Sequence, residues 1–280
     1  MIENIVSNEP LIRVGSFLGV FAAIAVWEIL LPRRKQVVSR SVRWPSNIGV
    51  VVLNTVLLRM VLPTSVVGLA LVASEHDWGL LNQVALPTWA AIVFALLALD
   101  FIIYVQHVLF HAVPVLWRLH RMHHADLEFD VTTGARFHPI EILLSMVLKF
   151  GVVAALGPPA IAVIVFEVVL NATAMFNHGN IKLATKLDRL LRWFVVTPDM
   201  HRIHHSIVTS ETNSNFGFNL PWWDRLFRTY RALPAAGHEG MTIGIERFRT
   251  PQDLRLDRML LQPLRGSAGN TAITQVDTNR

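Results

Sequence analysis

The chain has 280 residues, of which 52% are hydrophobic and only 16% are charged, and its mean hydropathy is +0.44. Soluble domains carry about 25% charged residues, so this composition excludes a cytosolic enzyme and a disordered chain and indicates an integral membrane protein. In such a protein the formal charge of +5 is typical of cytoplasmic loops rather than of nucleic-acid binding. The absence of cysteine excludes disulfides, thiolate zinc sites, iron–sulfur clusters and thiolate-ligated haem.

Three apolar stretches, residues 11–31, 47–73 and 87–111, are long enough for single spans, because a helix needs about 20 apolar residues to cross the hydrocarbon core. No charged region with a small-residue cleavage site precedes residues 11–31. We therefore expect this stretch to be retained as a span and not removed as a signal peptide. Residues 140–176 are also apolar, but Gly157-Pro158-Pro159 divides them into two arms of ~16 residues. We therefore expect an all-α membrane bundle of three spans plus a helical hairpin whose ends lie on one side.

Charges in the loops predict the orientation. The loop after the first stretch is strongly basic and the loop after the second is acidic, which places the first in the cytoplasm by the positive-inside rule. The basic residues are Arg33, Arg34, Lys35, Arg40 and Arg43, and the acidic ones are Glu75 and Asp77. We expect a multi-pass protein of a bacterial inner membrane.

Two opposite charges interrupt the hairpin. Lys149 lies nine residues before Pro158 and Glu167 nine residues after it, so antiparallel arms would place them at equal depth. Because charges inside a span need partners, we predict that the two side chains pair as a structural bridge.

The remaining sequence is less apolar. Residues 177–248 are mixed and rich in aromatic residues, which is typical of a cap at the membrane interface. Residues 254–264 suggest a short amphipathic helix, and the segment beyond Gly266 a disordered tail. We expect a membrane domain over residues 1–248 and a C-terminal segment with a tail over 249–280.

Ten of the twelve histidines lie between His107 and His205. His107 and His111 end the third span, on the same helical stripe as Asp100 and Tyr104. Two H-x2-H-H triplets follow with spacings that place three imidazoles on one side of a helix, and two single histidines stand between them. The triplets are His120, His123, His124 and His201, His204, His205, and the single residues are His138 and His178.

A lone histidine is most often a surface or core residue, and we interpret His76 and His238 in this way. Ten imidazoles clustered at the cytoplasmic ends of helices instead indicate metal ligation, and they suffice for two ions with four to five imidazoles each. No H-E-x-x-H motif supplies the general base of a zincin-type hydrolase. No carboxylate lies within the triplets, which disfavours a ferritin-like site. An all-nitrogen dinuclear centre beside the bilayer suits redox chemistry with O2 on a lipid.

These motifs, with H-P-I-E and N-H-G between the triplets, resemble the fatty acid hydroxylase/sterol desaturase superfamily of membrane di-iron enzymes. Residues 221–227, P-W-W-D-R-L-F, resemble the W-D-R-x-F segment that follows the last histidine box there. The resemblance covers about residues 99–231, and the H-x3-H spacing of the first box is nearer to a bacterial sterol-desaturase-like branch. It implies two bound Fe ions, O2 as co-substrate and a C–H bond of a lipid such as a sterol or fatty-acyl chain. All ten clustered histidines match metal-site histidines of the family, and no catalytic residue beyond them is assigned.

The chain shows no flavin, haem or nicotinamide motif, so electrons must come from a donor such as a ferredoxin or a cytochrome b5-like protein. Arg118, Arg121 and Arg202 could attract an acidic donor. We favour hydroxylation over desaturation. The alternatives are a membrane zinc hydrolase and a histidine-rich metal transporter or sensor.

Asp100 is a costly charge inside a span. We expect it to orient a ligating imidazole, and the alternative is an ion pair with Arg59.

Overall fold

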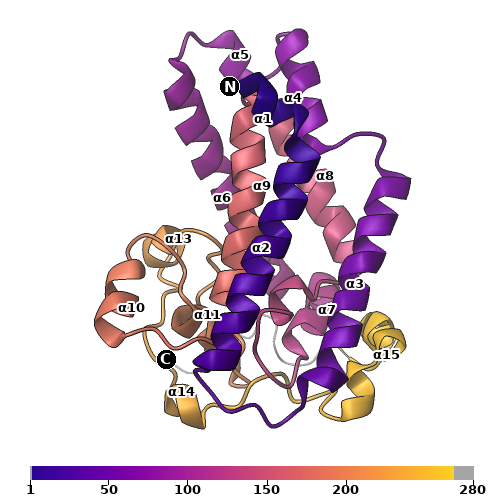
Figure 1. Cartoon of the computed structure of the whole chain (residues 1–280), viewed down its shortest axis with the longest axis vertical. Helices are drawn as coiled ribbons and strands as arrows, with labels where there is room; N and C mark the ends of the chain where they lie inside the picture. The colour runs from indigo at the N-terminus through magenta and orange to yellow at the C-terminus, as the bar shows by residue number, and fades with distance from the viewer. Residues whose placement is uncertain (1, 268–280) are drawn as a thin grey trace.

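A computed structural model describes residues 2–267 (Figure 1). Within these residues the regular structure is helical, with two isolated β-bridges, Pro32 to Ile181 and Ser206 to Ile243. The all-α prediction is confirmed. The predicted tail beyond Gly266 lies, from residue 268 on, outside the described residues.

Long helices form an upright bundle in Figure 1, with α9 near its centre and in contact with α2, α4 and α6. The long helices are α2 (Glu9–Leu30), α3 (Arg40–Val61), α6 (Thr88–Ala112), α8 (Pro139–Leu156) and α9 (Ala160–Asn177). By length and apolar composition, five segments of the described chain are able to cross a membrane: these helices, with α3 extended to Arg40–Gln83.

The second predicted stretch, residues 47–73, is not one continuous helix. α3 ends at Val61, Leu62 is extended, and α4 (Val66–Glu75) begins after Ser65, whose side chain accepts a hydrogen bond from the Gly68 N–H at 3.0 Å. Pro63 explains the break, because proline disfavours helical backbone in the residue before it. α4 lies with α1 (Ile2–Ser7) and α5 (Leu80–Gln83) at the top of the bundle in Figure 1.

The two arms of the predicted hairpin are the helices α8 and α9. α8 ends on Gly157, whose φ of +59° is the left-handed conformation that favours glycine at a helix C-terminus, and α9 begins after Pro159. The predicted ion pair is also present, with Lys149 Nζ 3.0 Å from Glu167 Oε1. Arg13 of α2 binds the second carboxylate oxygen at 3.0 Å, so this bridge joins three helices instead of two.

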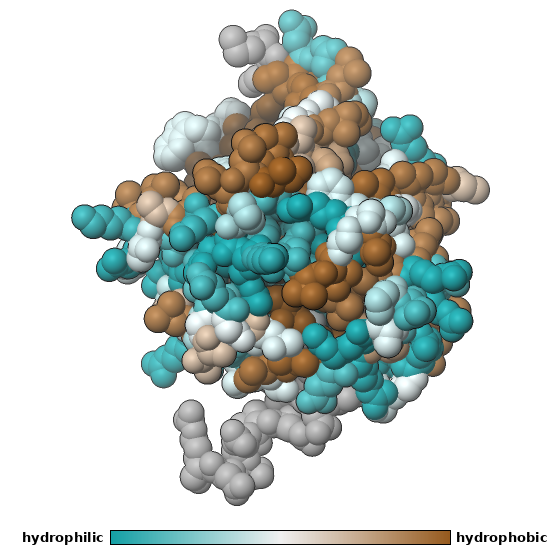
Figure 2. Space-filling model, turned by 60° about the horizontal axis from the view of Figure 1, so that its bottom comes forward, coloured by the Kyte–Doolittle hydropathy of each residue, from teal (hydrophilic) through white to brown (hydrophobic). Residues whose placement is uncertain are grey.

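Short helices form the predicted cap at the other end of the bundle (Figure 1). Hydrophilic side chains gather at this end, as Figure 2 shows. In the C-terminal segment, α15 buries Met259 against Val50 and Met122, as expected of a short amphipathic helix. The cap elements are α7 (Pro114–His124), η1 (Thr133–Ala135), α10 (Thr185–Leu191), α11 (Pro198–His204), α12 (Thr209–Thr212), α13 (Trp222–Leu226), α14 (Gly237–Gly240), η2 (Pro251–Leu254), α15 (Leu256–Leu261) and η3 (Gln262–Leu264).

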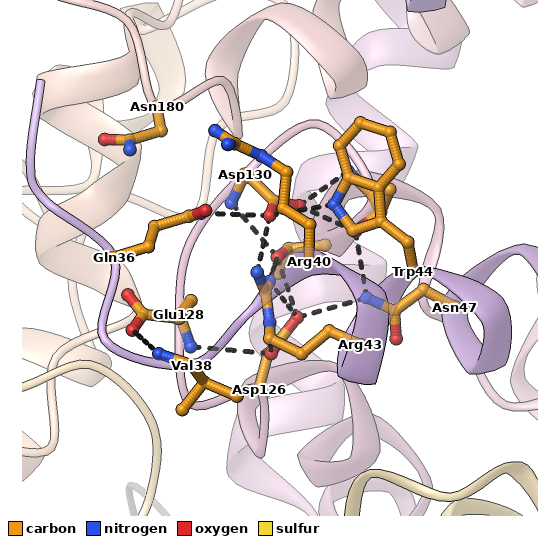
Figure 3. Close-up of polar contacts among 12 residues, drawn as sticks. Gln36, Val38, Arg40, Arg43, Trp44, Asn47, Asp126, Glu128, Asp130 and Asn180 are labelled. Carbon is orange, nitrogen blue, oxygen red and sulfur yellow. Dashed lines mark hydrogen bonds and ion pairs between the residues drawn. The ribbon is translucent and has the colours of Figure 1, made fainter. Parts of the chain in front are cut away.

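A buried ionic network attaches α3 to the loop that follows α7 (Figure 3). The Arg43 guanidinium donates to both carboxylate oxygens of Asp126, at 2.7 and 2.8 Å, and to Asp130 at 2.5 Å. All three side chains are fully buried. Burial alone would raise the pKa of Asp126, but the guanidiniums of Arg43 and Arg136 lower it below its usual range. Arg43, expected as a loop charge that marks topology, therefore has a structural role.

Candidate metal centre

Four short stretches of helix converge on one point below the bundle. The last turns of α6 carry His107 and His111, and Pro114 then starts α7, which carries His120, His123 and His124 on its inner side. His178 follows the last residue of α9, and α11 brings His201 and His204, with His205 directly after it. All nine side chains are buried.

The structure divides these nine imidazoles into two groups. The first group holds five residues: His107, His111, His120, His124 and His204. The second group holds four: His123, His178, His201 and His205. In each group one nitrogen of every ring lies within 4.8 Å of the others. Each group is thus large enough to hold one metal ion.

Ring nitrogens in both groups lie at distances that suit a shared ion. His178 Nε2 is 3.1 Å from the Nε2 atoms of His123 and His201 and 3.2 Å from that of His205. In the other group, His120 Nε2 is 3.1 Å from His107 Nε2 and 3.2 Å from His124 Nε2. Two imidazole nitrogens bound to one ion at about 2.1 Å and near-right angles would lie about 3 Å apart.

The protonation states of the imidazoles also fit a metal, because a ligating histidine must be neutral. Burial lowers the pKa of His120 and of His178 to about 3. Burial and the neighbouring imidazoles lower the pKa of His204 as well. The Nε2 atoms of His111 and His204 are buried without a hydrogen-bond partner among residues 2–267, although an unsatisfied buried polar atom is costly. A cation in each group would satisfy these nitrogens.

Hydrogen bonds from outside the groups fix the direction of several rings. The Nδ1–H groups of His107, His178 and His204 donate to the carbonyls of Phe216, Ala174 and Ser214 at 2.7, 2.7 and 2.8 Å. These bonds set the tautomer that leaves Nε2 free as a ligand.

Glu141 of the H-P-I-E motif is a site residue whose role the sequence pattern did not predict. Its Oε1 accepts a hydrogen bond from His120 Nδ1 at 2.6 Å, and the side chain is buried. A carboxylate in this position orients an imidazole and raises its basicity as a ligand.

We expect Glu141→Gln to weaken iron binding about tenfold. This is the low end of the loss of metal affinity seen when a carboxylate that hydrogen-bonds a ligating histidine is replaced. The amide still accepts the hydrogen bond but lacks the negative charge. A chelator titration of the iron-loaded protein measures this change, with Glu75→Gln on the exposed end of α4 as control. Equal iron affinity in Glu141→Gln and wild type would show that Glu141 does not tune the centre.

Asp224 of the W-D-R segment holds the loop that positions His107. Its carboxylate accepts the backbone N–H groups of Phe216 and Gly217, each at 2.8 Å, and the Thr229 hydroxyl at 2.7 Å. The Phe216 carbonyl is the group that accepts the hydrogen bond from the Nδ1–H of His107. The segment that marks the family resemblance thus supports the first histidine box.

Both interpretations of Asp100 are wrong. Its Oδ2 accepts a hydrogen bond from the indole N–H of Trp223 at 2.7 Å, and Arg59 is exposed on α3. Asp100 therefore ties α6 to α13, and no imidazole among residues 2–267 forms a hydrogen bond with it. The polar edge of Trp223, a residue of the aromatic-rich cap, makes this bond.

The structure does not bring His138 to the other nine histidines. His138 precedes Pro139 at the start of α8, and its Nδ1 accepts the Ile140 N–H at 3.2 Å as a helix cap. Its Nε2 is 3.2 Å from the Leu260 carbonyl. Both nitrogens are thus engaged outside the two groups, and a role of His138 as a metal ligand stays a prediction.

The three arginines expected to attract an electron donor form hydrogen bonds or ion pairs with other residues of this chain. Arg202 is fully buried and pairs with Asp199, and Arg121 is buried and donates to the carbonyls of Gln262 and Arg265. Arg118 donates to the carbonyls of Pro263 and Gly266. These residues anchor the C-terminal segment and the cap. The structure therefore does not support a role for them in attracting an acidic electron donor.

A cavity of about 250 Å³ adjoins the first group of histidines. His107, His120 and Glu141 line it, together with residues of α2, α3, α6, α8, α9 and η1 and with Phe137 and Phe218. The arrangement therefore joins a metal-binding cluster to a space inside the span-forming helices.

Comparisons with known proteins agree with this site. The model of the family described as fatty acid hydroxylase matches residues 92–229, which include all nine converging histidines and Asp224. Residues 92–229 are a fatty acid hydroxylase domain, of the kind found in the fatty acid hydroxylase/sterol desaturase superfamily. Relatives in this family include the ornithine lipid hydroxylase OlsE of Rhizobium tropici, which is 33% identical over 53% of this chain and 44% of its own length.

Two further relatives of the superfamily are more distant. The alkylglycerol monooxygenase of Homo sapiens is 26% identical over 58% of this chain and 34% of its own length. The cholesterol 25-hydroxylase of Rattus norvegicus is 28% identical over 51% of this chain and 47% of its own length. The chain thus spans less than half the length of these relatives. No solved structure matches the chain.

Proposed function

We propose that this protein is an O2-dependent lipid hydroxylase whose two iron ions are held by its nine clustered histidines. The observation that carries the proposal is the pair of adjacent imidazole groups, of five and four residues, beside a cavity within the span-forming helices. Imidazole suits several metals, and the family of oxygen-using lipid enzymes favours iron over zinc. Residues 1–248 would be the catalytic domain and residues 249–280 an accessory segment.

Bound iron would supply the activation of O2 and its transfer to a C–H bond. Overall, one oxygen atom enters the C–H bond, and the other leaves as water with two electrons and two protons from an external donor. The chain's residues would bind the ions, and Glu141 and Asp224 would hold His120 and His107 in place. The cavity would present the lipid beside the five-histidine group and limit the access of water.

The relatives favour hydroxylation over desaturation, since their names describe hydroxylases and monooxygenases that act on an ornithine lipid, an alkylglycerol and cholesterol. We further propose that the centre faces the cytoplasm of a bacterial inner membrane. The basic loop between α2 and α3 lies at the histidine end of the bundle, as the positive-inside rule requires. A ferredoxin or cytochrome b5-like protein would deliver electrons there.

The test is lipid mass spectrometry of a bacterial host that expresses the chain, compared with the same host expressing His123→Ala. We expect a lipid class that gains the mass of one oxygen atom only with the wild-type chain. Growth in heavy-isotope O2 should label this atom. If every lipid is unchanged, or if the label comes from water, the hydroxylase proposal is overturned. Hydrolysis of a lipid by the protein loaded with zinc and free of iron would instead support the hydrolase alternative.

A further inference from the structure

The last turn of α2 lies outside the matched residues 92–229, yet it contacts a segment that carries a histidine of the four-membered group (Figure 1). Glu28 in this turn is fully buried. Its Oε2 accepts the backbone N–H groups of Val131 and Asn180, each at 3.1 Å. Asn180 comes two residues after His178, a member of the four-histidine group. Glu28 therefore holds the segment that carries this imidazole.

Gly179 allows α2 to approach this segment closely. A Cβ atom at this position would lie 3.0 Å from the Cγ2 of Ile24, which precedes Glu28 by one helical turn. Such a contact is tighter than ordinary van der Waals packing, so a larger residue would push the segment away from α2. The three successive residues after α9 thus have separate roles as a ring in the histidine group, a close contact and an anchor: His178, Gly179 and Asn180.

The loop directly after α2 adds bonds to the same region. The Asn180 side chain accepts the Arg34 N–H at 3.0 Å and donates to the Arg34 carbonyl at 2.8 Å, and its own carbonyl accepts the Arg33 N–H at 2.8 Å. The Arg33 guanidinium binds Asp199, two residues before His201, at 3.2 Å. We call Glu28, Arg33 and Arg34 the α2 clamp. It contacts both segments that carry His178 and His201 of the four-histidine group.

The five-histidine group is supported from other elements. Its ring nitrogens are held by Glu141 of α8 and by the carbonyls of Phe216 and Ser214. The α2 clamp instead binds the segments on which the four-histidine group depends. Loss of the clamp should therefore affect one ion and spare the other.

Glu28 is poorly suited to a purely stabilising role. Its Oε1 is buried without a hydrogen-bond partner among residues 2–267, and its ion pair with the Arg40 Nε is 3.8 Å long. A buried carboxylate without a close counter-ion costs more free energy than an apolar side chain of similar size. What the carboxylate offers instead is direction, because it accepts N–H groups from two separate segments.

His178 is the ring through which such a contact would act on the whole group. Its Nε2 lies 3.1 Å from the Nε2 atoms of His123 and His201 and 3.2 Å from that of His205. A shift of the His178 backbone would therefore change three distances between ring nitrogens at once. Small displacements matter here, because metal ligands must keep their geometry closely.

We propose that Glu28 is a positioning residue for the ion of the four-histidine group, acting through the backbone of Asn180 on His178. This proposal rests on the proposed function, which places one ion in each group. It extends the metal centre to a helix outside the family domain. Arg33 and Arg34, expected as loop charges that mark topology, belong to the same support.

The test titrates the metal-free full chain in detergent with Fe²⁺ and a competing chelator in the absence of O2. We expect wild type to bind two ions and Glu28→Ala to bind one of them about tenfold more weakly, with the other unchanged. Glu28→Gln should restore the affinity to within about threefold, because its amide oxygen still accepts both N–H groups. The control is Glu9→Ala, which removes the other carboxylate of α2, paired with Arg13 at the opposite end. It should bind both ions like wild type.

A second substitution identifies the ion that is affected. His205→Ala already leaves the four-histidine group incomplete, so adding Glu28→Ala to it should change the affinity of the remaining ion by less than about twofold. In His204→Ala, where the other group is incomplete, Glu28→Ala should still weaken one ion about tenfold. A loss of the same size in both backgrounds would contradict the proposal.

Two ions bound with wild-type affinities in Glu28→Ala would overturn this proposal alone, and so would equal weakening of both ions, which marks a general loss of structure. Wild type binding fewer than two ions would overturn the proposed centre and this proposal with it. If Glu28→Ala does not fold, Glu28→Asp decides, because it keeps the charge but withdraws the carboxylate by one carbon. It should weaken one ion selectively, and wild-type affinity for both ions would overturn the proposal.

Discussion

Replacing His123 by Ala is expected to reduce bound iron from about two ions per chain to about one and to abolish lipid hydroxylation. His123 belongs to the four-histidine group, so its loss leaves three imidazoles, fewer than the four ligands usual for such ions. His204→Ala in the five-histidine group leaves four and should lower iron content less. Elemental analysis of the purified variants measures both effects.

His138→Ala is the matched control for these variants, because His138 is a buried histidine close in sequence that lies outside both groups. It should keep about two ions per chain, as in a dinuclear centre. Full iron content in His123→Ala and His204→Ala would contradict the assignment of ligands. Iron loss in His138→Ala equal to that in His123→Ala would show that the metal site includes His138 after all.

Replacing Arg43 by Met is expected to cost about 3–5 kcal/mol of unfolding free energy, the usual effect of removing one partner from a buried ion pair. The change leaves Asp126 and Asp130 buried with no guanidinium from α3, although Asn47 and Thr133 still donate to Asp126 (Figure 3). Asp126 is two residues after His124, so the loss should also loosen the second histidine box. Denaturant unfolding in detergent micelles measures the free energy.

The control for Arg43→Met is Arg255→Met, which breaks an exposed pair with Asp257 at 3.1 Å. Exposed pairs contribute about 0–1 kcal/mol, so this variant should unfold like wild type. If Arg43→Met is as stable as Arg255→Met, the network in Figure 3 is not a stabilising element of the cap.

Local spacing explains which features were predictable from the sequence. Histidines spaced at i, i+3 and i, i+4 belong to one helix, and helix geometry alone places their rings on one side of it. The hairpin follows from Gly157 and the two prolines after it, and the Lys149–Glu167 pair follows from their equal distance to Pro158. The grouping of the rings into five and four also matches the number of ligands that one ion accepts.

Partners far apart in the chain carry no such local signal. Asp100 bonds Trp223, and Arg43 bonds Asp126, across 123 and 83 positions, so neither pair could be derived from a helical interval. The position of His138 outside both groups has a local cause, since a residue directly before a helix-starting proline occupies the capping position. The role of Glu141 was open to prediction from H-P-I-E, because a carboxylate beside metal-site histidines often orients one of them.

Nine histidines are proposed to hold two ions of iron in adjacent groups. Crystals of the iron-loaded protein, measured at the X-ray absorption edge of iron, test it most directly through anomalous scattering. We predict two peaks, one among His107, His111, His120, His124 and His204 and the other among His123, His178, His201 and His205. A single peak, a peak at His138, or scattering at the zinc edge alone would contradict this account.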